Sequence, residues 1–144
     1  MNTKQIGEVS EACILAELLK KGYSVSKPFG DNQKYDLIID DRNYLLKAQC
    51  KTATLVNGAL QCPITRTKGI WKKGEAHREP YSNKDVDVFL FYNEDLNKVY
   101  WVPFSLVSNK KTAISLRVEK TKNNQNKGVF LAESFELSSL SSAG

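Results

Sequence analysis

The chain has 144 residues, 41% of them apolar and 26% charged, which is enough for one globular domain with a real core. No stretch approaches the roughly 20 apolar residues that span a bilayer, and the N-terminus lacks the basic-then-apolar layout of a secretion signal, so we expect an intracellular protein. The net charge of +5 and the pI near 9.1 are compatible with a polyanionic partner, although an excess of lysine is also an ordinary route to solubility.

Helical periodicity extends from about Thr3 to Lys21, with Thr3 as the candidate N-cap and Gly22 as the C-terminal stop. At ~100° per residue, one face of this helix carries the apolar side chains of Ile14, Leu15, Leu18 and Leu19. Glu11 falls among them, and a carboxylate on a core-facing stripe is costly unless it is paired, solvated by a cleft or bound to a metal. Glu8 lies at the edge of the same sector, where the helix dipole explains it, and is a secondary candidate.

The rest of the chain is typical of short strands separated by turns. A strand in "YSVSKPF" precedes a turn at residues 30–32, and "YDLIID" with "NYLLKAQCK" forms a hairpin that turns at residues 40–43. A further strand pair in "TATLVNGALQCPITRT" breaks at Asn57–Gly58. "VDVFLFY" and "KVYWVPF" are expected as a core and an edge strand, and a short helix follows near residues 103–108.

This order of elements predicts a single α/β domain over residues 1–137, with a central mixed β-sheet flanked by helices. Residues 138–144, "SSLSSAG" in the sequence, are expected to form a low-complexity tail.

The second arm of the first hairpin carries polar side chains on a strand that otherwise looks buried. Strand side chains alternate, so one face holds Leu45, Lys47, Gln49 and Lys51. Asp36 opens the first arm, where taken alone it could simply cap the preceding loop. The turn at residues 40–43, however, brings Asp36 beside Gln49 and Lys51.

These residues have a shared chemical logic. Phosphodiester hydrolysis needs a hard cation held by oxygen ligands, and a positive charge beside the attacking water. Asp36 supplies a carboxylate, Gln49 a side-chain carbonyl and Cys50 its backbone carbonyl. Lys51 supplies the positive charge, and Glu11 completes the metal ligands from the helix.

The spacing from Asp36 to Gln49-Cys50-Lys51 resembles the PD-(D/E)XK nuclease motif, with Tyr35-Asp36 in place of Pro-Asp and Gln49 in place of the usual acid. The segment "IGEVSEACILAELLKKGYSV" looks like the first helix of that family, in which Glu11 matches the acidic residue of the metal site. "YSNKDVDVFLFYNEDLNKVYWVPF" looks like a branch of small enzymes that includes intron-encoded homing endonucleases and is related to archaeal-type Holliday junction resolvases.

The resemblance covers most of residues 6–104. It implies a restriction-endonuclease-like core, dependence on Mg²⁺ with Mn²⁺ as a substitute, and cleavage of DNA. The neutral Gln49 adds no negative charge, so metal affinity depends on Asp36 and Glu11.

Basic residues gather in "RTKGIWKKGEAHR", inside a segment of about residues 63–80. We expect DNA contacts from Arg66, Lys68, Lys72, Lys73 and Arg78. His77 is the one histidine of the sequence and is assigned to DNA contact or to the surface rather than to general base catalysis. A solvated basic loop remains the alternative for this segment.

The leading hypothesis is a site-specific homing endonuclease that cuts double-stranded DNA as a homo-oligomer, either a dimer or a tetramer, because two-fold protein symmetry matches that of opposed strands. A Holliday junction resolvase or a restriction or repair nuclease would use the same chemistry on DNA selected by shape. A DNA-binding module that has lost catalysis is the alternative of a different class. The remaining reading is a basic structural protein, in which the polar cluster is coincidental.

Overall fold

The computed structural model describes residues 1–70, 76–119 and 129–140, with side chains described outside 67–77. Helix α1 spans Thr3–Lys20. Its N-cap is Asn2 rather than the predicted Thr3, because Asn2 and Gln5 form a capping box: each side chain accepts the other residue's backbone N–H at 2.9 Å. Gly22 ends the helix as predicted, with a φ of 91° that few other residues adopt.

The buried face of α1 is centred on Ser10, Ile14 and Leu18. The prediction that Leu19 belongs to this face is wrong, since 54% of its surface is exposed. Contact with the sheet follows the line of residues spaced by four, which rotates Leu19 toward solvent. Glu11 is half-buried beside this line, at the margin of the interface.

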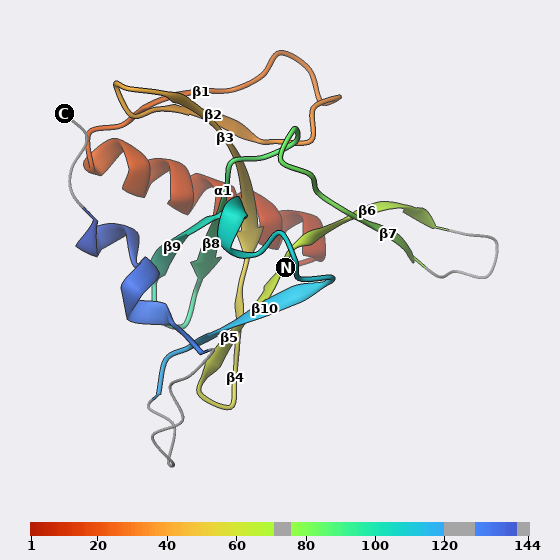
Figure 1. Ribbon diagram of the computed structural model, residues 1–144, viewed down its shortest axis with the longest axis vertical. Coiled ribbons are helices and arrows are strands. Elements are labelled where there is room, and N and C mark those ends of the chain that lie inside the picture. The colour runs from red at the N-terminus through yellow and green to blue at the C-terminus, as the bar shows by residue number, and fades with distance from the viewer. Residues whose placement is uncertain (71–75, 120–128, 141–144) are drawn as a thin grey trace.

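A five-stranded mixed sheet forms the centre of the molecule (Figure 1). Its strands, in the spatial order of the sheet, are β1 (Ser24–Ser26), β2 (Leu37–Asp40), β3 (Leu45–Thr52), β8 (Val88–Asn93) and β9 (Lys98–Pro103). The pair β3 and β8 is parallel, and the other neighbours are antiparallel. The mixed sheet, the hairpin of β2 and β3, and the roles of β8 as a core strand and β9 as an edge strand are all confirmed.

A second sheet covers the face of the first that is opposite α1. Its strands, in spatial order, are β11 (Phe130–Leu131), β10 (Ala113–Arg117), β5 (Ala59–Pro63) and β4 (Thr54–Val56). The predicted break at Asn57–Gly58 is the turn between β4 and β5, where both residues have positive φ, 50° and 77°. The predicted short helix near residues 103–108 is a single 3₁₀ turn, η1 (Phe104–Leu106).

Two further 3₁₀ turns follow, η2 (Ala132–Phe135) and η3 (Leu137–Ser139).

The side chains of strand β8 point alternately into two apolar cores, one on each face of the central sheet. Val88 and Leu90 pack toward α1, and Phe89 and Phe91 pack toward the second sheet. Within the described residues, an α-helix therefore flanks one face of the central sheet, and a sheet covers the other.

The basic segment forms a two-stranded antiparallel ribbon of β6 (Thr65–Ile70) and β7 (Ala76–Pro80), with a bulge between Thr67 and Gly69. We call β6 and β7 the ribbon. Figure 1 shows it projecting from the body of the molecule. No helix in the described ranges is long and apolar enough to span a bilayer.

Candidate active site

Asp36 is held against the strand that carries the other candidate residues. The register of β2 and β3 pairs Leu37 with Ala48, so Asp36 lies next to Gln49. The backbone N–H of Asp36 donates to the Ala48 carbonyl at 2.8 Å, and its Oδ2 accepts the backbone N–H of Cys50 at 2.9 Å. The carboxylate is thus fixed across the hairpin, which a simple loop cap would not require.

Glu11 approaches the same place from α1. Its Oε1 lies 2.9 Å from Lys27 Nζ, and Lys27 follows β1. A cavity of about 190 Å³ is lined by Glu11, Lys27, Tyr35 and Asp36, together with residues of the connecting loop. Two carboxylates from distant parts of the sequence therefore share one cavity with a lysine.

The pKa of Asp36 is raised above its ordinary value. Burial is the largest cause, and the negative charge of Glu11 acts in the same direction. The hydrogen bond from Cys50 and the charges of Lys51 and Lys27 oppose this shift without cancelling it. A further cation at this position would stabilise the ionised form of Asp36.

Lys51 lies between the carboxylates and the ribbon. Its Nζ donates to the backbone carbonyl of Thr65 at 2.8 Å and sits 5.4 Å from the centre of the Tyr81 ring. Burial lowers the pKa of Lys51 to about 8, with help from the positive charges of Arg78 and Arg66, whereas Asp36 opposes the shift. A lysine whose amine binds its proton so weakly is unusual on a strand and is suited to accept or donate a proton near neutral pH.

Gln49 and Cys50 offer neutral oxygen atoms. Gln49 is half-buried and pairs in register with Phe89 of β8. The Cys50 side chain packs with the core beneath α1, and burial raises the pKa of its thiol, so the sulfur stays protonated. Its backbone carbonyl is the group that Cys50 could offer to a hard metal ion.

The donor set fits a hard divalent cation. Asp36 and Glu11 are carboxylates whose charges repel. Gln49 lies opposite Asp36 in the hairpin and offers an amide oxygen, but it is not among the residues that line the cavity. In the described part of the chain, no three His, Cys, Asp or Glu residues group as metal ligands. The site thus combines two acids with neutral oxygens, which predicts a weaker metal site than a three-carboxylate set would give.

The other predicted residues lie at or near the ribbon. Arg66 Nε is 3.5 Å from Glu79 Oε1, and Arg78 is exposed on β7. Lys68 and His77 lie on β6 and β7, but their side chains are not among those described. Lys72 and Lys73 lie outside the described residues.

Glu8, the secondary candidate, is exposed on α1, and the cavity is lined by Glu11 instead. Glu8 precedes Glu11 by three residues, which turns it ~60° around the helix axis from Glu11 and places it ~4.5 Å nearer the N-terminus.

Sequence reasoning missed Lys27 and Tyr81. After Gly22 the chain reverses, and a strand that runs back beside the helix reaches the level of Glu11 after about five residues, given ~3.3 Å per strand residue against 1.5 Å per helix residue. This geometric signal could have found Lys27. Tyr81 has no such signal, because its place over Lys51 depends on where the ribbon rejoins the body.

Comparisons with known proteins agree with this fold. A search of curated protein sequences gives no significant match. Among solved structures, the bacterial homing endonuclease I-Ssp6803I superposes with a TM-score of 0.74 at 26% sequence identity, covering 96% of this chain and 90% of that one. The family model for PD-(D/E)XK endonucleases matches residues 1–138. The family match over nearly the whole chain, together with the shared fold, shows that the chain belongs to the PD-(D/E)XK endonuclease family.

Proposed function

We propose that this protein is a Mg²⁺-dependent endonuclease that hydrolyses phosphodiester bonds of double-stranded DNA at the cavity between α1 and the loop that joins β1 to β2, which Glu11 and Asp36 both line. The observation that carries the proposal is the placement of Asp36, which is fixed by the Cys50 N–H beside a lysine of lowered pKa and shares its cavity with Glu11. A purely structural role would not explain two repelling carboxylates and a half-buried amine at one end of a hairpin.

Asp36, Glu11, Gln49 and the Cys50 carbonyl would hold the metal ion, with Mn²⁺ as a substitute for Mg²⁺. When bound, such an ion polarises the phosphate and lowers the pKa of a coordinated water. Lys51 orients or activates the attacking water, because its amine is near Asp36 and has a pKa close to neutral pH. The backbone carbonyl of Thr65 fixes the direction of that amine.

The ribbon is the proposed DNA-contacting element. It begins at Thr65, the residue that accepts the Lys51 hydrogen bond, so DNA held along the ribbon would lie next to Lys51. Arg66 and Arg78 flank this junction, and Lys68, Lys72, Lys73 and His77 belong to the same segment. Phosphate contacts from such residues give affinity, and any arginine facing a base gives specificity.

Site-specific homing is the substrate choice that the comparison favours, since I-Ssp6803I is a homing endonuclease and this chain covers 90% of it. Cutting both strands with one cavity per chain implies a homo-oligomer, a dimer or a tetramer, whose symmetry relates two cavities to the opposed strands. A DNA substrate also implies that the protein acts inside the cell.

The test is cleavage of plasmids that carry candidate intron-insertion sites, with magnesium against EDTA. Wild type is compared with Asp36→Ala and Lys51→Ala, and with the exposed-residue controls Asp95→Ala and Lys110→Ala. Discrete metal-dependent cuts that only the two site variants lose would support the proposal. No cleavage by wild type, with salt-sensitive DNA binding retained, would instead identify a DNA-binding module, and preference for a four-way junction would identify a resolvase.

A further inference from the structure

The loop between β1 and β2 presents a fully exposed aromatic ring. Phe29 has 106% of its reference surface exposed, against 74% for Met1, the next most exposed of the large apolar residues described. A single exposed apolar side chain is common and needs no function. The surroundings of Phe29 therefore decide whether its exposure has a use.

Phe29 lies between two residues of the cavity wall without lining the cavity itself. Its neighbours Pro28 and Gly30 both line the cavity that holds Glu11 and Asp36, while the ring itself extends into solvent. Gly30 has a φ of 82°, and this backbone conformation turns the chain sharply directly after Phe29. The ring is thus exposed to solvent at the rim of the cavity.

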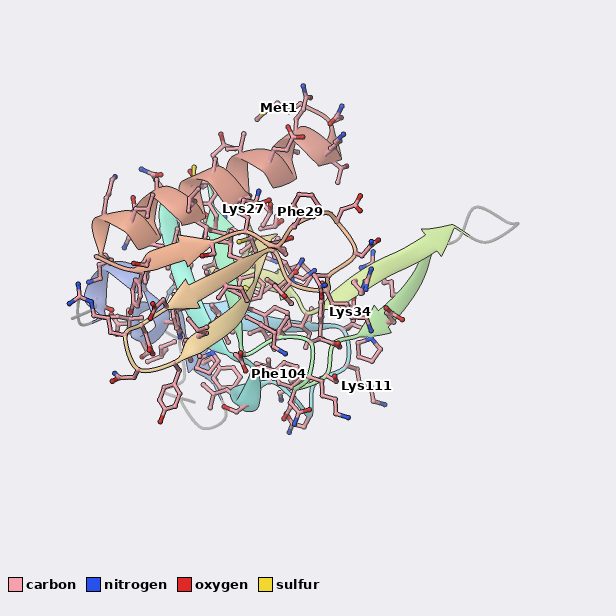
Figure 2. All side chains as sticks on the ribbon, turned by 90° about the horizontal axis from the view of Figure 1, so that it is seen from above. Met1, Lys27, Phe29, Lys34, Phe104 and Lys111 are labelled. Atoms are coloured by element: carbon pink, nitrogen blue, oxygen red, sulfur yellow. The ribbon has the colours of Figure 1, made fainter. Side chains whose placement is uncertain are left out.

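Ion pairs anchor both ends of this loop. Lys27 pairs with Glu11 of α1 at 2.9 Å, and Lys34 Nζ lies 3.9 Å from Glu79 Oε1 of the ribbon and 3.8 Å from Asp85 Oδ1. Figure 2 shows Lys27 and Phe29 near the helix and Lys34 toward the base of the ribbon. Anchors at both ends limit the positions of the loop, so the ring is held between the helix and the proposed DNA-contacting element.

We propose that Phe29 is a wedge that inserts into the base stack of bound DNA beside the phosphate to be cut. The inference rests on the proposed function, because the occupant is the DNA substrate. The Asp36 carboxylate is half-buried at the end of a hairpin, so a phosphate on a straight duplex has to be drawn toward it. Apolar side chains that enter a base step unstack it and bend the duplex, which moves the adjacent backbone.

A direct test uses Phe29→Trp as a reporter. Its fluorescence is measured with a plasmid-length linear duplex in EDTA, where cleavage is prevented, and is compared with wild type to subtract the two natural tryptophans. The matched control is Tyr44→Trp, an exposed aromatic position at the opposite end of the β2–β3 hairpin. We expect strong quenching of the Phe29→Trp indole by DNA and little change for the control.

Rate measurements give a second readout. Phe29→Ala should lower the cleavage rate roughly tenfold to hundredfold, as loss of one base-stacking contact would do. The salt dependence of DNA binding should stay unchanged, because phenylalanine carries no charge. Phe29→Leu and Phe29→Trp should keep much of the wild-type cleavage rate, since each supplies an apolar wedge.

The outcomes separate this inference from the proposed function. Absence of DNA binding by wild type would overturn both. Binding and cleavage by wild type, with an unquenched Phe29→Trp indole and a normal rate for Phe29→Ala, would overturn the wedge alone. A smaller oligomer for Phe29→Ala in sedimentation velocity would also overturn it, because the ring would then lie between copies of the chain. Lys51→Ala should lose cleavage but leave the quenching intact.

Discussion

Lys27 Nζ lies 2.9 Å from Glu11 Oε1, so a lysine occupies the carboxylate that the proposed metal ion would need. Glu11 raises the pKa of Lys27 through this contact, which shows that the pair favours the charged amine. A divalent ion would therefore compete with Lys27 for Glu11 and would be repelled by its charge.

Lys27→Met should consequently bind Mn²⁺ several-fold more tightly than wild type in the absence of DNA, measured by isothermal titration calorimetry. The matched control is Lys20→Met, which removes an equivalent lysine paired with Glu17 on the outside of the same helix at 3.1 Å. That control should leave the affinity unchanged. Weaker binding by Lys27→Met would contradict the prediction and would mean that Lys27 positions Glu11 for the metal.

Lys51 is expected to reduce stability in exchange for function. Burial lowers its pKa from 10.5 to about 8, so below pH 8 the fold holds an ammonium that the unfolded chain would solvate better. Because the pKa of Lys51 is lower in the folded state than in the unfolded one, Lys51 costs no stability above pH 10.5. The cost develops as pH falls from 10.5 and is fully present below about pH 8. At pH 7 the cost is at most about 3 kcal/mol.

Lys51→Met should therefore raise the free energy of unfolding at pH 7 by about 1–2 kcal/mol, after allowance for the lost hydrogen bond to Thr65. Urea denaturation at pH 7 measures this change. The control is Lys110→Met at an exposed position, which should leave the free energy of unfolding almost unchanged. DNA cleavage should be lost in Lys51→Met alone. A destabilised Lys51→Met would show that the ammonium contributes to the fold.

Local signals in the sequence were sufficient for the hairpin that builds the site. Alternation from Leu45 to Lys51 fixes which side chains share a face, and one register brings Asp36 beside Gln49. Asn57–Gly58 was equally predictable, because two consecutive residues with positive φ suit that pair of residue types. Short-range chemistry determined both features, so the sequence alone could reveal them.

Features that depend on distant segments could not be predicted. Strands β5 and β10 pair across some fifty residues of chain, so no local pattern indicated that a sheet, rather than helices, covers the second face. The prediction for Leu19 is wrong because the sheet contacts a narrower stripe of α1 than the pattern of apolar residues predicts. The N-cap is Asn2 and not the predicted Thr3, because the reciprocal hydrogen bonds between Asn2 and Gln5 satisfy two backbone donors.

Asn93 should be important for stability. Its side chain is buried, with Nδ2 donating to the Ala53 carbonyl and Oδ1 accepting the Leu96 N–H, each at 2.9 Å. Asn93→Ala removes both bonds and leaves a carbonyl unpaired, so we expect a loss of about 2 kcal/mol in urea unfolding. Asn43→Ala, at an exposed position of another turn, should change stability by less than about 0.5 kcal/mol. Equal effects of the two substitutions would contradict this account.

Asp85 should make stability depend on pH at the base of the ribbon. Burial alone would raise its pKa, but the backbone and hydroxyl of Ser82 and the charges of Lys34 and Lys47 outweigh burial and hold the pKa below 3.8. The Ser82 N–H donates to Asp85 Oδ2 at 2.8 Å. Because the folded pKa is depressed, this contribution is present above the unfolded value and is lost as pH falls through the folded one.

Asp85→Asn should therefore be less stable than wild type by about 1 kcal/mol at pH 7, a value kept small by solvent screening. The difference should shrink as pH falls from about 5 to below the ordinary aspartate pKa. Thermal unfolding followed by circular dichroism from pH 7 to pH 3 measures it, with Asp95→Asn as an exposed control that stays parallel to wild type. A constant difference between Asp85→Asn and wild type across this range would mean that the carboxylate acts through shape and not through its charge.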